Sequence, residues 1–161
     1  MSNRVVDNKQ IGNIGDVLKD NLKKGSKLSI AAQYLTLYAF VELQKELNKI
    51  DEFRFVFTNP ISEQINENAY PEIYGVKEEH NYKLKLNQSY VAKEVAFWLK
   101  KKAQIKRMID KKIEGGLYHV NNPDGSQIGI VGGVPFSSPS LGFSNSKNFY
   151  INNVIDNVQT N

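Results

Sequence analysis

The sequence contains no cysteine, and its 161 residues include only two histidines and one tryptophan. The missing thiol excludes disulfide bonds, cysteine nucleophiles and the cysteine-based classes of zinc site. His80 and His119 are then the only imidazoles that could bind a metal ion. Two imidazoles without supporting thiolates make a metal centre unexpected, and we expect no cofactor.

Long apolar runs are also missing, since none approaches the roughly 18 residues that a membrane-spanning helix needs. The first residues, 1–4, do not lead into the apolar core of a secretory signal. We therefore expect a cytoplasmic protein that does not contact a membrane. The apolar share of 40% and the charged share of 24% are typical of a globular chain. Its length predicts a single domain over residues 1–161.

Positive charge is present but unevenly distributed. The formal net charge is +4, yet the window 100–112 alone carries seven basic side chains and one acid, Asp110. The basic residues are Lys100, Lys101, Lys102, Lys106, Arg107, Lys111 and Lys112. A basic segment on a nearly neutral body favours an anionic partner such as DNA or RNA. The alternative is a solvated helix end and loop, because charge runs are often only surface.

Hydrophobic periodicity predicts an α/β fold. Apolar residues recur at helical spacing over 14–24, 37–48 and 89–102. Runs typical of strands occur at 28–32, 53–58, 103–109, 117–120, 128–131 and 149–155. The first half alternates helix and strand, which predicts parallel strands covered by helices. Residues 61–87 show only weak periodicity, with a possible short helix at 63–68.

Four aromatic residues could stack on nucleic-acid bases or pack in the core. They are Tyr34, Tyr38, Phe97 and Trp98. Their spacing within expected helices and strands favours the core. The glycine-rich stretch 129–133 lacks the Lys-Ser/Thr pair of a phosphate-binding loop, so we do not interpret it as one.

Three segments together resemble one family. They include residues 28–38 (LSIAAQYLTLY), 53–60 (FRFVFTNP) and 148–156 (NFYINNVID), with GLYHV at 116–120 before the last. They resemble the phospholipase D-like domain found at the N-terminus of bacterial SNF2-type and DEAD/DEAH-box helicases, and as a stand-alone nuclease. The resemblance implies an α-β-α sandwich, with a mixed, largely parallel sheet and helices on both faces.

The same resemblance implies where an active site would lie. Active members carry a His-x-Lys-x4-Asp motif, then a Gly-Ser-Ser-Asn-like turn and a glutamate on the last strand. Their histidine attacks phosphorus, while the lysine, the asparagine and backbone donors hold the phosphoryl charge. Six positions of this sequence align with the histidine, lysine, aspartate, serine, asparagine and glutamate of active members. In that order they are Glu114, Gly116, Asn121, Gly133, Pro135 and Tyr150.

These replacements remove the chemistry that the resemblance implies. Glu114 is an anion that would repel a phosphodiester, and Gly116 offers no charge. Pro135 offers neither a side-chain donor nor a backbone N–H. The sequence therefore predicts a non-catalytic domain that binds nucleic acid or a partner protein. The resemblance implies that such a domain is either the N-terminal part of a helicase-type protein or a stand-alone protein.

Two alternatives stay open. His119 could act as a shifted nucleophile in a rearranged nuclease site. However, it lies five residues after Glu114, which places it on the opposite face of a strand, so a simple hydrogen bond is the better expectation. The resemblance also implies that two single-motif chains can pair. The chain could therefore form a homodimer, or bind and inhibit an active homologue.

Overall fold

A computed structural model describes residues 2–58, 88–109, 111 and 113–157 of the chain. Its elements are β1 (Ser2–Asp7), α1 (Ile14–Asn21), β2 (Lys27–Ala32), α2 (Leu37–Glu42), α3 (Gln44–Leu47), β3 (Glu52–Thr58), α6 (Gln88–Lys102), β4 (Ala103–Met108), β5 (Gly116–Asn121), β6 (Gln127–Gly132), α7 (Ser138–Leu141) and β7 (Ile151–Asp156). The predicted helices and strands in these ranges are present, except that the helix expected over 37–48 is divided into α2 and α3. The helix considered at 63–68 lies outside the described residues, as do Asp110 and Lys112.

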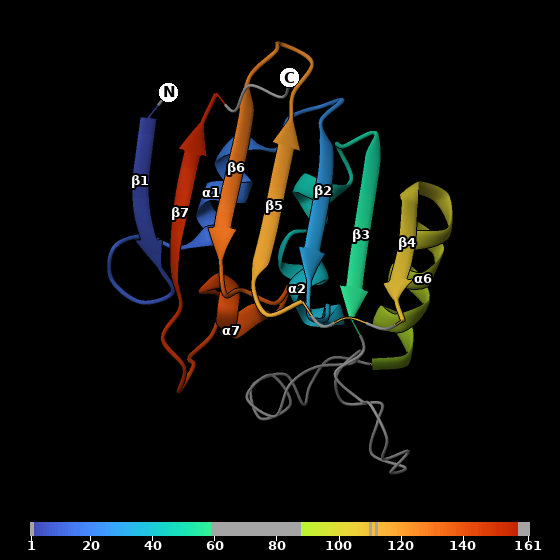
Figure 1. Ribbon diagram of the computed structural model, residues 1–161. Coiled ribbons are helices and arrows are strands. Elements are labelled where there is room, and N and C mark those ends of the chain that lie inside the picture. Colours follow the sequence, from blue (N-terminus) through green and yellow to red (C-terminus); the bar gives the residue numbers. More distant parts are fainter. Residues whose placement is uncertain (1, 59–87, 110, 112, 158–161) are drawn as a thin grey trace.

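The strands form one seven-stranded sheet in the order β1-β7-β6-β5-β2-β3-β4 (Figure 1). The fold is mixed α/β, as expected. The largely parallel sheet is wrong, because only the β2–β3 and β3–β4 pairs are parallel and the other four pairs are antiparallel. Parallel neighbours need a long crossover, whereas β5 and β6 are joined by a tight turn in which Gly125 adopts a φ of 82°.

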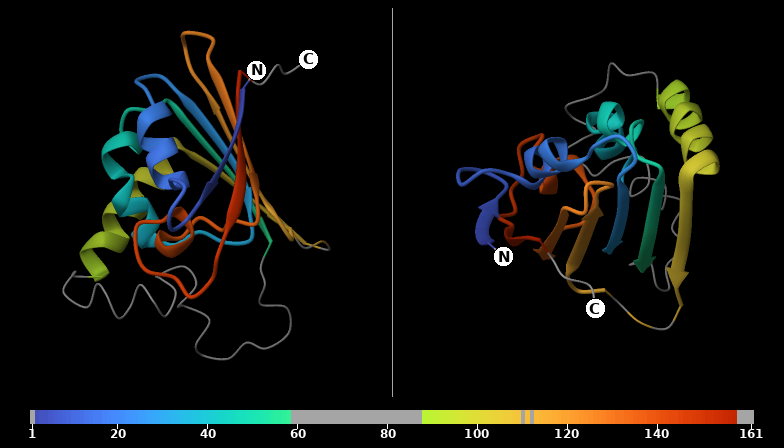
Figure 2. Two further views of the ribbon diagram at one scale, coloured as in Figure 1. Left: turned by 90° about the vertical axis from the view of Figure 1, so that its left-hand side faces the viewer. Right: turned by 90° about the horizontal axis from the view of Figure 1, so that it is seen from above.

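The described helices all lie against one face of the sheet (Figure 2). Helices on both faces, as the resemblance implied, are therefore not seen in the part of the chain that the structure describes. Strand β2 shows the resulting asymmetry, because Leu28, Ile30 and Ala32 are buried while Lys27 is exposed. Leu28 pairs with Phe53 of β3, whose ring packs against Trp98 of α6, so the buried residues face the helices. We call the side without helices the open face.

An aromatic cluster joins the sheet to the elements that cover it. The fully buried ring of Phe53 on β3 lies 5.4 Å from Trp98 of α6 and 6.4 Å from Phe136, measured between ring centroids. Trp98 also meets Phe40 of α2 edge-on at 4.5 Å. These contacts hold α6, α2 and the segment after β6 against the sheet at β3, next to its β4 edge.

The aromatic residues expected in the core divide into two groups. Tyr38 and Trp98 are buried as predicted, and Tyr34 is half-buried. For Phe97 the prediction is wrong, because 71% of this residue is exposed. Successive helical residues point about 100° apart, so Phe97 cannot face the sheet when Trp98 does.

Strand β1 was missed by the sequence analysis, because only its last residues, Val6 and Asp7, are buried. Asp7 organises the loop that follows. Its Oδ1 accepts hydrogen bonds from the backbone N–H groups of Lys9, Gln10 and Ile11, at 2.6, 2.6 and 3.1 Å. Burial alone would raise the pKa of the Asp7 carboxyl, but these three donors outweigh it and the pKa is lowered.

Replacing Phe53 with alanine should lower the free energy of unfolding by about 3–5 kcal/mol, the usual loss for a fully buried phenylalanine. Phe97→Ala removes an equally large ring from the surface and should change it by about 0.5 kcal/mol or less. Urea unfolding followed by circular dichroism measures both. Equal losses in the two variants would contradict the assigned core.

The lowered pKa of Asp7 predicts a dependence of stability on pH. A carboxyl with a depressed folded pKa stabilises the fold above its unfolded pKa of about 3.9, and this contribution is lost as the pH falls below that value. Wild type should therefore be more stable than Asp7→Asn at pH 7, and the difference should shrink below about pH 4. The exposed α1 variant Asp20→Asn serves as the control in the same urea titrations.

Candidate functional site

The positions that the resemblance marks as catalytic gather, with one exception, at one end of the sheet. Gly116 at the start of β5 pairs with Gly132 at the end of β6, and Gly132 pairs in turn with Asn152 of β7. Four other positions lie at the same end of the sheet. Glu114 precedes β5, Gly133 and Pro135 follow β6, and Tyr150 precedes β7. The exception is Asn121, which lies at the opposite end of β5, about 16 Å from Gly116 at the usual rise of a strand.

The space at the centre of this end is filled by the chain itself. A Cβ atom on Gly116 would lie 2.5 Å from the backbone oxygen of Val134. A Cβ atom on Gly132 would collide with the buried amide of Asn152, which covers that glycine. A lysine at position 116, as in active members, therefore does not fit this backbone without a shift.

Two tyrosine hydroxyl groups near the same end make hydrogen bonds within the fold. Tyr118 is buried, and its hydroxyl donates a hydrogen bond to the backbone oxygen of Val134 at 3.1 Å. Burial raises the pKa of Tyr118 well above its usual value, with a smaller contribution from Tyr34, so it stays a neutral donor. The hydroxyl of Tyr150 accepts a hydrogen bond from the amide of Asn148 at 3.3 Å. None of these groups is an activated nucleophile.

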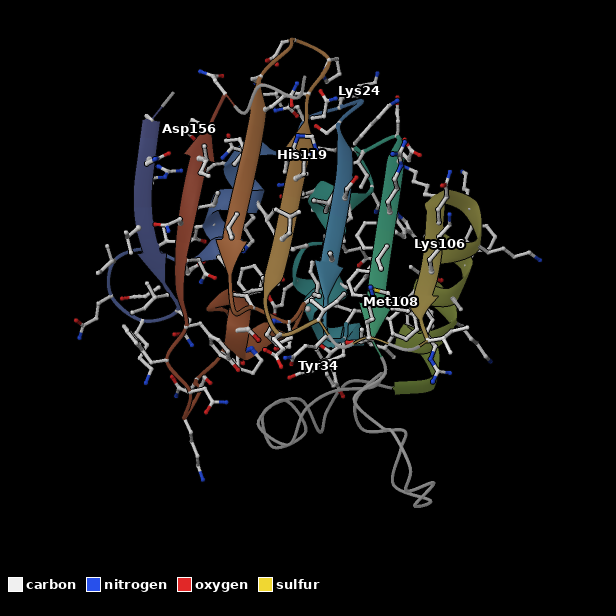
Figure 3. All side chains as sticks on the ribbon, viewed as in Figure 1. Lys24, Tyr34, Lys106, Met108, His119 and Asp156 are labelled. Atoms are coloured by element: carbon white, nitrogen blue, oxygen red, sulfur yellow. The ribbon has the colours of Figure 1, made fainter. Side chains whose placement is uncertain are left out.

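His119 lies on the open face, the side of β5 opposite to Gly116 and Tyr118 (Figure 3). Its Nε2 makes a hydrogen bond of 3.0 Å with Oε1 of Gln127, so a side-chain amide is its partner. An orienting carboxylate of the kind that activates a catalytic histidine is not bonded to it among the described residues. His80, the other histidine, lies outside the described ranges.

The basic residues predicted to bind nucleic acid come together at the β4 edge of the sheet. We define the basic edge as Lys100 and Lys101 at the end of α6, Lys106 and Arg107 on β4, and Lys111 beyond it. All five are exposed. Lys106 projects from the open face and Arg107 from the helix side, because neighbouring strand residues alternate (Figure 3).

Lys102 differs from its neighbours in the same run. Its ammonium group donates hydrogen bonds to the backbone oxygens of Asn48 and Ile50, at 2.8 and 2.6 Å. These carbonyls lie just past α3, so Lys102 ties α6 to the segment before β3. Its charge is therefore used within the fold.

Acidic partners of the basic edge are not found among the described residues. The ion pairs there join Lys23 to Asp124, and Lys27 and Arg54 to Glu52. The hydrogen bond from Arg54 lowers the pKa of Glu52, and this carboxylate also accepts a hydrogen bond from Gln104 of β4 at 3.3 Å. The charge of the basic edge is therefore available to an external anion.

No three histidine, aspartate or glutamate side chains come together in the described ranges as ligands for a metal ion. No helix of these ranges has both the length and the apolar character needed to cross a bilayer.

No protein-family model matches the sequence, and no curated protein sequence matches it. Among solved structures the chain is similar to yeast tyrosyl-DNA phosphodiesterase, with 13% identity and a TM-score of 0.48 over 95% of this chain and 31% of that one. A His-to-Asn mutant of the yeast enzyme gives 13% identity and a TM-score of 0.45, over 94% and 32% of the two chains. The chain thus spans about a third of the length of these structures. With TM-scores below 0.5, the similarities assign neither a family nor an activity.

The crowding around Gly116 predicts that a lysine at this position, where the resemblance would place one, destabilises the fold. Gly116→Lys should lower the free energy of unfolding by about 1–3 kcal/mol, as overpacking commonly does. Gly133→Ser adds a side chain where a Cβ meets nothing within 4 Å, and should change the free energy of unfolding by about 0.5 kcal/mol or less. Urea unfolding distinguishes them. A fully stable Gly116→Lys protein would show that this end of the sheet is open.

Proposed function

We propose that the chain is a non-catalytic phospholipase D-like domain that binds nucleic acid through the basic edge. The observation that carries the proposal is the set of five exposed cations at one edge of the sheet, without acidic partners among the described residues. Lysine and arginine side chains of this kind bind phosphate and release condensed counterions from the nucleic acid.

The absence of catalysis is supported by the residues at the family positions. Gly116 and Pro135 supply neither charge nor a hydrogen-bonding side chain, and Glu114 supplies the wrong charge for a phosphodiester. The nearby tyrosine Tyr118 is held neutral in the core. Phosphoryl transfer needs a nucleophile and a set of donors for the developing charge, and Glu114, Gly116 and Pro135 replace the histidine, lysine and asparagine that active members use for these roles.

Binding through phosphate contacts has a measurable signature. If all five cations of the basic edge neutralise phosphates, the logarithm of the binding constant should fall against the logarithm of salt with a slope of about −3.5 for a single strand. Phosphate contacts carry no direct base information, so the sequence preference should be weak. The helicase context and pairing with a second chain rest on the sequence resemblance alone.

The test is fluorescence anisotropy with short labelled DNA at low salt. The double variant Lys106→Glu with Arg107→Glu should weaken binding about tenfold or more and make the salt slope shallower by about 1.4 for a single strand, because two phosphate contacts are lost. Lys147→Glu reverses an exposed charge outside the basic edge and should weaken DNA binding less than the double variant does.

Two outcomes contradict the proposal. Absence of binding at low salt removes its nucleic-acid part. Metal-free cleavage of plasmid DNA that disappears in His119→Ala removes its non-catalytic part and favours a rearranged nuclease site on the open face.

A further inference from the structure

We propose that the outer face of α6 binds single-stranded nucleic acid by stacking bases on Phe97 and Tyr90. This inference rests on the proposed function for the attraction of phosphates, and it adds the class of nucleic acid and the residues that hold the bases. We define the α6 outer face by Tyr90, Lys93, Phe97, Lys100 and Lys101.

The two aromatic rings are exposed on the same side of the helix. Tyr90 and Phe97 are 61% and 71% exposed, whereas Val95 and Trp98 of the same helix are buried against the sheet. Seven residues separate the rings, which is about two helical turns or 10.5 Å. That distance corresponds to about three nucleotides at the stacked rise of about 3.4 Å per strand.

Exposed cations surround these rings. Lys93 precedes Phe97 by four residues, and Lys100 and Lys101 follow it by three and four, so all three lie beside the ring on the helix surface. Glu94 is the acid on this part of α6. Three cations to one anion give the surface the charge complementary to a phosphate backbone.

Strand β4 adds two further cations beyond the C-terminal end of the helix. It begins at Ala103 directly after Lys102, and Figure 2 shows α6 leading into β4 at the edge of the sheet. Lys106 and Arg107 therefore follow Lys100 and Lys101 along the chain, and both are exposed. The α6 outer face continues into the basic edge at this end of the helix.

Exposed aromatic rings beside cations favour single-stranded nucleic acid as the ligand over a duplex or a protein. A duplex hides the faces of its bases, so it cannot stack on exposed rings, whereas single strands bind proteins by such stacking in a positively charged setting. The cores of protein interfaces are depleted of charge, and lysine in particular is disfavoured there. Lysines on two successive turns around Phe97 therefore fit a nucleic acid better than a protein.

The experiment compares labelled dT12 with a mixed-sequence 12-base-pair duplex by anisotropy at one low salt concentration. Phe97→Ala should weaken dT12 binding by about 5- to 150-fold, the effect of about 1–3 kcal/mol per stacked base, and change duplex binding by less than about twofold. Tyr90→Ala should act in the same direction, and Phe97→Trp should retain dT12 affinity. Phe149→Ala removes an exposed ring elsewhere and serves as the matched control.

The outcomes separate this inference from the proposed function. If Phe97→Ala and Tyr90→Ala bind dT12 like wild type while the Lys106→Glu, Arg107→Glu double variant is weakened, stacking on α6 is wrong and the basic edge stands. If dT12 and the duplex bind equally and both ignore the aromatic variants, the single-strand preference is wrong. If neither probe binds at low salt, both proposals fail. Circular dichroism of each variant shows that the comparisons concern folded protein.

Discussion

The packing of the Phe53 ring is the contact on which the arrangement of this protein depends. From β3, next to the edge strand β4, it meets Trp98 of α6 and Phe136 of the segment after β6. Trp98 lies on the helix that carries Lys100 and Lys101 of the basic edge, and Phe136 directly follows Pro135. One buried ring therefore fixes α6 and the segment after β6 relative to the sheet.

A second contact holds the segment after β6 in place. Phe136 follows Pro135 directly and is fully buried, and Tyr118 packs against its ring with centroids 6.3 Å apart. Apolar contacts therefore hold this segment against the sheet. Val134 and Asn152 fill the space beside Gly116 and Gly132.

The sequence predicted those parts of the fold whose signals are local. Strands β2 and β3 and helix α6 follow from their hydrophobic periodicity, which reflects direct burial against the core. The expectation of a largely parallel sheet was wrong, because four of the six strand pairs are antiparallel. Pairing direction depends on the connections between strands rather than on the apolar pattern of one strand. Strand β1 was missed because it is an edge strand with little burial.

The candidate site was predictable to a similar degree. Charge counting found the basic edge, but it could not show that Lys102 is used to bond backbone carbonyls or that Lys106 and Arg107 project from opposite faces. Both facts depend on how the chain folds around these residues. Phe97 was assigned to the core because of its spacing within an expected helix, and only the rotation of the docked helix distinguishes it from Trp98.

That rotation has a practical consequence for optical measurements. Trp98 is the sole tryptophan of the chain, and it lies between Phe40 and Phe53 on the side of α6 that faces the sheet. Its emission therefore reports whether α6 remains docked. Phe97, one residue away, points to solvent and does not contribute to that signal. The fluorescence of Trp98 thus reports the packing of the inner face of α6, and a ligand that binds the outer face does not contact this fluorophore.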